Sequence, residues 1–564
     1  MLPRISIPAV TDDPGGPIAQ YWPLSIVLTL LVICLYTGLI VSIDNTNLGT
    51  TNGLWKTPDV SAWEHGTGTP TDDGEWLYTK SYGYLARLIP DRWVQYGTPA
   101  PVVTFRKMAM LNAIFGALAS GVVFLLALRF TKSPVAACLI SFIHAGAGFV
   151  LLNSINSEDI IAGYAFFVGA AFCFFEFLRV ARPWLLLAAA FLFALATLFH
   201  WTLMAPGLAA FAAVLLLVMF RHRVYIWISA VWFFFFACAV QVVLLVSYFH
   251  QVIPVWAALY PTKAAPSGWV GIRLDKLWFT ACGVGNYFTG AANASNFHAA
   301  FAGSGRHFMI VSWLFDIITL GACLAALLRR RTTFSLKCFA LFALALVAVG
   351  EVEAFYSQPQ DPQMQIQPMF ATMVGLILLA ERAQACSLPM RRLLAGSLAG
   401  VVLVNGIANI EVLRVSAGGD SRALSQILEL ETQFPRTSTV TVTQGFEGWV
   451  TWQYVMLFQG RRNDFLEHSL QLATPFTDAG VITGLDAAKR MRCGIDQALS
   501  DGRLVVASAL WTQTPEEVVR SLSTVAAEPE ARVYDSILRN SYRIGRKWDT
   551  SLGTFVELLP GPAR

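Results

Sequence analysis

The chain of 564 residues carries too few charges for a soluble protein. Hydrophobic residues make up 55% of it and charged residues 13%, whereas a soluble domain carries roughly 25% charged residues. The mean hydropathy of +0.55 agrees with this. The net charge of +4, without a basic block, gives no indication of a nucleic-acid partner. The composition therefore predicts an α-helical polytopic membrane protein.

Eleven apolar runs are long enough to cross a bilayer as helices, which takes about 20 residues each. The runs lie near 23–43, 107–128, 134–153, 160–179, 183–203, 205–220, 224–249, 308–328, 334–350, 366–381 and 391–412. The first run is not followed by a small-residue cleavage site. We therefore expect a retained first helix rather than a removed signal peptide.

Every second connection between these runs is short and basic. The basic residues are Arg129, Lys132, Arg179, Arg182, Arg221, Arg223, Arg329, Arg330, Arg331, Lys337, Arg391 and Arg392. The positive-inside rule predicts that these connections are cytoplasmic. The sequence thus predicts a multi-pass protein of the inner (plasma) membrane, with a cytoplasmic N-terminus and with the chain after Leu413 on the outer, periplasmic side.

The remaining connections, including the long loops 44–106 and 250–307, then face outward and contain most of the acidic residues. The tail behaves differently, because helical stretches alternate with strand-like runs at Thr439–Val442, Leu504–Ala507 and Thr554–Leu559. This alternation is typical of an α/β domain. We predict a membrane domain over 1–413 and a small extracytoplasmic α/β domain over 414–564, with a structural or substrate-docking role.

The first outer loop contains the densest acidic cluster. Asp72, Asp73 and Glu75 fall within four residues, followed by Trp76 and Lys80. Neighbouring carboxylates repel one another, and they persist most easily if they bind a divalent cation or if one acts as a general base. The alternative is a solvated acidic turn. Asp44, directly after the first run, is a further candidate at the membrane surface, or else a residue hydrogen-bonded within the helix end.

Other outer segments supply further candidates for substrate binding. Each has a structural alternative. Glu158 and Asp159 could instead follow a helix cap at Ser157, and His200 could be a packed interfacial histidine. Glu353 and Asp361 could lie in a solvated linker, and the cations of loop 250–307 on an amphipathic helix with ordinary interfacial anchors. Cations interleaved with aromatic residues in loop 250–307 suit a lipid phosphate. The candidates are Glu158, Asp159, His200, Lys263, Arg273, Arg306, His307, Glu353 and Asp361.

The order of these features resembles the GT-C class of membrane glycosyltransferases. The features are the retained first helix, the acidic first outer loop, about eleven spans and the outer C-terminal domain. The Asp72-Asp73 pair matches the paired-acid motif of the class, and Glu158-Asp159 matches the acidic second outer loop of some members. A shorter likeness, at Thr71-Asp72-Asp73-Gly74 and 96–99, is to polyprenyl-phosphate arabinofuranosyltransferases.

The resemblance implies a polyprenyl-phosphate-linked sugar as donor and a glycan, lipid or protein as acceptor. Asp72 or Asp73 would take the proton of the acceptor hydroxyl as it attacks the anomeric carbon. Cations of loop 250–307 or a divalent ion (Mg, Mn or Ca) would meet the charge of the leaving phosphate. Such an ion would be held by Asp73, Glu75 and Glu158.

Three other functions remain open from the sequence, one of them a non-catalytic scaffold in envelope assembly. A transporter or lipid flippase predicts ionisable residues within several spans and broken helices in matching halves, and Asp316 is the clearest such residue. An O-antigen-ligase-like enzyme predicts an essential His and Arg pair in a large outer loop, for which His298, Arg306 and His307 are available.

Overall fold

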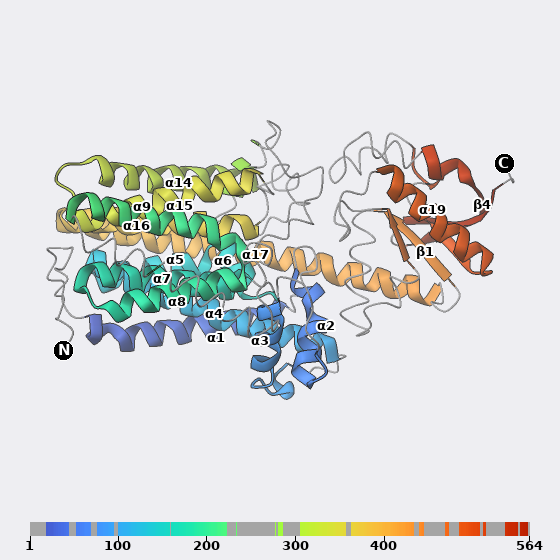
Figure 1. The fold of residues 1–564 in the computed structure, drawn as a ribbon, viewed down its shortest axis with the longest axis horizontal. Helices are drawn as coiled ribbons and strands as arrows, with labels where there is room; N and C mark the ends of the chain where they lie inside the picture. The colour runs from blue at the N-terminus through green and yellow to red at the C-terminus, as the bar shows by residue number, and fades with distance from the viewer. Residues whose placement is uncertain are drawn as a thin grey trace.

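The computed structural model describes most of the membrane region and parts of the tail. The described residues are 18–43, 52–68, 76–94, 100–157, 160–222, 233, 277, 280, 281, 283–285, 305–356, 362–433, 439–444, 469–472, 484–507, 511–514, 536–550 and 553–561. Within these ranges the protein is a bundle of long helices joined by one of them to a strand-containing region (Figure 1).

The bundle helices match ten of the predicted runs. They are α1 (Trp22–Ile43), α4 (Ala100–Thr131), α5 (Pro134–Gly146), α6 (Gly148–Ser154), α7 (Ile160–Val180), α8 (Pro183–Phe199), α9 (Met204–His222), α14 (Gly305–Leu328), α15 (Phe334–Tyr356), α16 (Pro362–Gln384) and α17 (Leu388–Gln433). The predicted run 224–249 lies outside the described residues except for Phe233.

Seven helices in the described ranges are long and apolar enough to cross a membrane, and an eighth span results if α5 and α6 count as one. The apolar helices Pro183–Phe199 and Met204–Phe220 are shorter. The prediction of a polytopic helical protein is therefore confirmed. The predicted total of eleven spans is not established by these residues.

Aromatic rings fill the centre of the bundle. Phe211 of α9 lies 5.0 Å from Phe174 of α7 and 5.3 Å from Phe342 of α15, measured between ring centroids. Phe342 also stacks on Phe167 at 6.1 Å. These edge and stacked arrangements suit the quadrupoles of the rings, and they hold α7, α9 and α15 together.

The two ends of the bundle differ in chemistry. At one end, Arg129 of α4 and Arg179 of α7 both pair with Glu176, at 2.8 and 2.7 Å. Lys132 lies within electrostatic range of Glu381 at the end of α16. We call this the basic end. The opposite end carries α2 (Asn52–His65) and α3 (Trp76–Ala86), and we call it the first-loop end (Figure 1).

The predicted run 134–153 is not one straight helix, because α5 and α6 meet at an angle of 65°. A bend frees backbone carbonyls that lipid cannot satisfy. The bundle supplies donors instead: Tyr36 of α1 donates to the Ala145 carbonyl at 2.7 Å, and Asn405 and Asn409 of α17 donate to the Gly146 carbonyl at 3.3 and 2.6 Å. The bend is therefore a hydrogen-bonded part of the fold.

The tail forms a mixed sheet. Its strands are β1 (Thr439–Gln444), β2 (Ser469–Leu472), β3 (Leu504–Ala507), β4 (Tyr542–Thr550) and β5 (Gly553–Pro560), in the order β2-β1-β3-β5-β4. The strand β1 pairs parallel to β2 and β3, while β5 pairs antiparallel to β3 and β4. The helix α19 (Gly484–Ser500) connects β2 to β3, as expected for an α/β domain.

One helix links the two regions. The sequence predicts a span at 391–412 and a separate helix at Ser421–Glu431, but α17 runs without a break for 46 residues. The predicted domain boundary after Leu413 falls inside this helix. Figure 1 shows α17 leaving the bundle at the first-loop end, so the sheet and the helices α2 and α3 lie on the same side of the bundle.

Candidate functional site

The described part of the first long loop, 44–106, folds onto the start of α4. Tyr78 and Tyr82 of α3 are fully buried, and they form an apolar cluster with Val60 of α2 and Met108 of α4. The helices α2 and α3 approach closely at Gly83, where an added Cβ atom would lie 2.3 Å from the Trp63 Cβ atom. The described helices of the loop, α2 and α3, are therefore a packed cap on the bundle.

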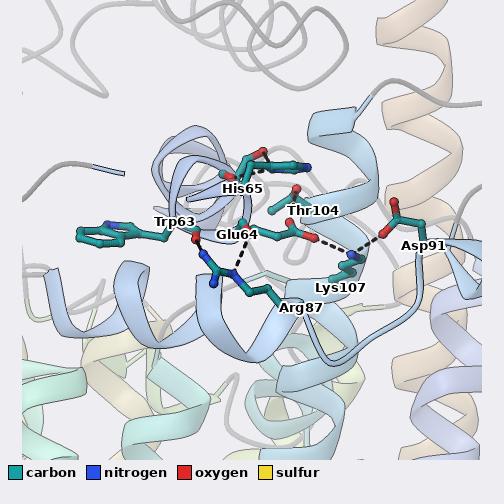
Figure 2. Close-up of polar contacts among 8 residues, drawn as sticks. Trp63, Glu64, His65, Arg87, Asp91, Thr104 and Lys107 are labelled. Carbon is teal, nitrogen blue, oxygen red and sulfur yellow. Dashed lines mark hydrogen bonds and ion pairs between the residues drawn. The ribbon is translucent and has the colours of Figure 1, made fainter. Parts of the chain in front are cut away.

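A buried ion pair fastens this cap (Figure 2). The Lys107 ammonium of α4 lies 2.5 Å from the Glu64 carboxylate of α2, and the two side chains are 3% and 7% exposed. Thr104, one turn earlier on α4, donates to the other Glu64 oxygen at 2.7 Å. Both oxygens of Glu64 are thus paired, as a buried carboxylate requires.

Two further cations of the loop are engaged by the protein itself. Arg87 donates to the carbonyls of Trp63 and Glu64 at 2.5 and 2.7 Å (Figure 2). This places its positive charge at the C-terminal end of α2, where the helix dipole favours a cation. Lys80 lies 5.2 Å from the centroid of the Trp63 ring. Within the described residues, Lys80 and Arg87 therefore help to hold α2 against α3.

A layer of buried hydrogen bonds lies beneath the cap. Tyr78 donates to the Ser157 carbonyl at 2.9 Å, Tyr82 donates to Asn112, and Asn112 donates to the Asn156 carbonyl at 2.6 Å. The layer joins the first loop to the turn that precedes α7. The Ser157 hydroxyl is buried without a hydrogen-bond partner in the part of the chain that the structure describes, so the alternative of a helix cap at Ser157 gains no support there.

The turn between α8 and α9 adds polar groups at the same end. His200 is buried, and its Nδ1 atom lies 2.6 Å from the Thr202 hydroxyl. Gln367 of α16 donates to the Thr202 carbonyl at 3.2 Å. Gln365, two residues earlier, donates to Glu351 of α15 at 3.4 Å. Polar side chains from the α8–α9 turn, α15 and α16 therefore lie at the first-loop end.

The structure describes only part of the predicted site. Lys80 and His200 occupy the positions given above, and Glu353 lies in the last turn of α15 with both carboxylate oxygens buried and unpaired among the described residues. Trp76, Arg306 and His307 are placed only by their helices, in the first turn of α3 or α14. Nine predicted residues lie outside the described ranges: Asp44, Asp72, Asp73, Glu75, Glu158, Asp159, Lys263, Arg273 and Asp361.

Even so, the described residues fix where the acidic cluster joins the fold. Segment 69–75, which contains Asp72 and Asp73, begins after the end of α2 and stops at the start of α3. Both helices pack at the first-loop end. Among the described residues, no group of three or more His, Cys, Asp or Glu side chains could hold a metal ion, and the predicted metal ligands Asp73, Glu75 and Glu158 lie outside them.

Sequence reasoning missed Glu64 and Lys107. Glu64 is a single acid in an amphipathic segment, and Lys107 opens the second apolar run, where a lysine is normally assigned to the membrane surface. A signal was available, since an ionisable residue next to a span is a functional candidate by default. That Glu64 and Lys107 pair with each other could not be predicted from the sequence, because 43 residues separate the two side chains.

These features define a polytopic helical membrane protein with a folded first-loop cap and a small C-terminal strand-containing region at the same end. No protein-family model matches the chain, and no curated protein matches it. Among solved structures, it is similar to ArnT from Cupriavidus metallidurans bound to undecaprenyl phosphate, with 12% identity and a TM-score of 0.51, over 97% of this chain and 100% of that one.

The apo state of the same ArnT gives a TM-score of 0.48 at 11% identity, with the same coverage. At such identities the likeness concerns the fold alone. At that level the predicted resemblance to the GT-C class and the predicted fold class are confirmed. The likeness extends over the tail as well as the bundle, since nearly the whole of both chains is covered.

Proposed function

We propose that this chain is an integral membrane glycosyltransferase that moves a sugar from a polyprenyl-phosphate donor to an acceptor hydroxyl at the outer face of the membrane. The observation that carries the proposal is the fold, which is shared along nearly the whole chain with a protein bound to undecaprenyl phosphate. Convergence of polar groups on the first-loop end supports the same assignment.

The proposed reaction takes place at the first-loop end. The acceptor hydroxyl oxygen forms a bond to the anomeric carbon of the sugar, and its proton passes to Asp72 or Asp73. The bond between the anomeric carbon and the phosphate oxygen breaks, and the polyprenyl phosphate leaves with the electron pair. Lys263, Arg273, Arg306 or His307 would meet the charge that develops on the phosphate.

The described cap gives the proposed reaction site a rigid support. Glu64, Lys107 and Thr104 hold α2 on α4, and Tyr78 and Asn112 hold the cap on the turn before α7. A catalytic carboxylate must be held within a fraction of an ångström of the reacting group. We assign Glu64 and Lys107 to positioning, because each is already paired with protein groups.

Substitution of the acidic pair tests the proposal. Asp72→Asn, Asp73→Asn and the double variant are assayed for transfer from synthetic polyprenyl-phosphate-linked sugars, with the exposed Asp501→Asn as control. We expect loss of transfer in at least one single variant and in the double variant, with normal insertion and the control active. Full transfer by all three would refute the base assignment.

The donor and any metal need separate measurements. The lipid-linked sugar that accumulates in cells lacking this chain identifies the donor, including whether it is an arabinofuranosyl lipid. Carboxylate oxygens of Asp73, Glu75 and Glu158 suit Mg, Mn or Ca. Loss of transfer in EDTA, with recovery on adding one of these ions, is the expected result if they hold a cation.

A lipid transporter is the second candidate, favoured by the bend between α5 and α6 and by the buried Asp316. Transporters commonly bind substrate at broken helices that recur in matching halves. The part of the chain that the structure describes holds one such bent pair. Movement of a labelled polyprenyl-phosphate sugar across proteoliposomes without any glycosidic product would favour transport over transfer.

A further inference from the structure

Three consecutive arginines lie in the short turn 329–333 between α14 and α15. Arg329, Arg330 and Arg331 are all exposed, and we call these three residues the arginine turn. The backbone of the turn is held in place, because the Arg329 N–H donates to the Ala325 carbonyl of α14 at 3.1 Å. The chain therefore presents three adjacent positive charges on an ordered segment.

The arginine turn lies where two membrane helices leave the apolar layer. Both α14 and α15 are long and apolar enough to cross a membrane, and Figure 1 shows the turn between them at the end of the bundle away from α2 and α3. Ile317, Leu324 and Leu328 of α14 are exposed, and their helical spacing places them on one face that leads to the turn. Lipid acyl chains that cover this face have their headgroups at the level of the arginines.

The charges of the arginine turn are not neutralised within the described part of the chain. None of its three guanidinium groups has an ion pair or a hydrogen bond with a described residue. Other arginines at the basic end are engaged by the protein. Arg129 and Arg179 pair with Glu176, and Arg391 donates to the Cys386 carbonyl at 3.1 Å. The arginine turn is therefore available to an anion from outside this part of the protein.

We propose that the arginine turn binds the phosphate of an anionic phospholipid whose acyl chains lie against the exposed face of α14. Guanidinium groups bind phosphate oxygens through two parallel hydrogen bonds, and clusters of cations at the end of a membrane helix attract anionic lipids. A soluble polyanion would meet the same charges but would gain nothing from the apolar face. The inference goes beyond the proposed glycosyltransferase function and does not depend on it.

The test uses the full-length protein in detergent. Native mass spectrometry measures its affinity for phosphatidylglycerol and for phosphatidylcholine with the same acyl chains. Two variants each remove two charges from the arginine turn: Arg330→Gln with Arg331→Gln, and Arg329→Gln with Arg330→Gln. The matched control, Lys489→Gln with Lys547→Gln, removes two charges at exposed positions of the tail.

We expect the wild type and the control to bind phosphatidylglycerol more tightly than phosphatidylcholine. Both turn variants should lose about 30-fold in affinity for phosphatidylglycerol, the equivalent of about 1 kcal/mol for each surface cation removed. Their affinity for phosphatidylcholine should not change, because the apolar face of α14 is intact. Two turn variants keep the test decisive if one of them fails to fold.

The proposal would be overturned if the folded turn variants kept the wild-type preference for phosphatidylglycerol, or if the wild type bound the two lipids equally. A control that lost as much affinity as the turn variants would overturn it as well, because the net charge of the chain would then attract the lipid. Sugar transfer is not a readout here. Failure of the proposed enzymatic function therefore leaves this result unaffected, and the reverse also holds.

Discussion

The Nζ atom of Lys107 lies 2.5 Å from an Oε1 atom of Glu64, and both side chains are almost completely buried. The same ammonium lies 2.5 Å from Asp91, whose side chain is 62% exposed. A single lysine on α4 therefore joins two separate parts of the first long loop. The predictions that follow begin with this contact.

Lys107→Met is expected to detach α2 from α4, because it leaves the Glu64 carboxylate buried without a charge partner. Removing one member of a buried pair typically costs about 3–5 kcal/mol. Chemical unfolding in detergent measures the loss, and protease cleavage within 52–94 reports opening of the cap. Asp91→Asn is the control, and its cost should stay within about 1 kcal/mol because that partner is exposed.

The double variant Glu64→Gln with Lys107→Met should recover part of this loss, since no unpaired charge then remains buried. A double-mutant cycle gives the coupling energy directly. Equal costs for Lys107→Met and Asp91→Asn would show that the buried pair does not fasten the cap.

Gly375→Ala is expected to push α14 away from α16, because the added methyl group meets the Thr319 backbone rather than a movable side chain. Overpacking of this kind costs about 1–3 kcal/mol. Gly321→Ala, on α14, has no atom within 4 Å of the added carbon, so it should be neutral or slightly stabilising. Thermal unfolding of the two variants in one detergent makes the comparison, and equal stabilities would contradict the packing.

Glu176→Ala is expected to destabilise the basic end more than Arg179→Ala does. Glu176 is the shared partner of two arginines, and Arg129 is only 8% exposed, whereas Arg179 is 25% exposed. Loss of Glu176 therefore removes a paired carboxylate from a buried guanidinium at a cost of about 3 kcal/mol, while loss of Arg179 leaves Glu176 paired with Arg129. The reverse order in chemical unfolding would contradict the burial of Arg129.

Asn112→Ala is expected to loosen the cap from the turn before α7, because the amide both accepts from Tyr82 and donates to the Asn156 carbonyl. Buried partners left unsatisfied cost about 1–3 kcal/mol. Ser61→Ala, at a half-buried site in α2, is the control and should change stability by less than about 0.5 kcal/mol. Hydrogen exchange at residues 153–157 should rise in Asn112→Ala alone.

Helices and strands were predicted correctly from the sequence where local hydrophobic periodicity determines them. Ten apolar runs became helices, and the strand-like runs at Thr439–Val442, Leu504–Ala507 and Thr554–Leu559 became β1, β3 and β5. The strand β4 was missed because its residues are mostly exposed and polar, so no apolar alternation marks it. Its register comes from pairing with β5, which is a tertiary contact.

The parts that could not be predicted depend on distant contacts. The bend at Ala147 lies between Gly146 and Gly148, which is a local signal for it, but its freed carbonyls are satisfied from α1 and α17, at separations of 109 to 263 residues. The Glu64–Lys107 ion pair also depends on a distant contact, because 43 residues separate its two members. The roles of Asp72 and Asp73 stay predictions, since both lie outside the described residues.

The unbroken length of α17 has a mechanical consequence. At a rise of about 1.5 Å per residue, the 46 residues of this helix extend roughly 69 Å, which is more than twice the thickness of the apolar layer of a bilayer. Where a helix has no break it has no hinge. Any tilt of the α/β domain would therefore be transmitted to Asn405 and Asn409, and through them to the bend in the neighbouring span.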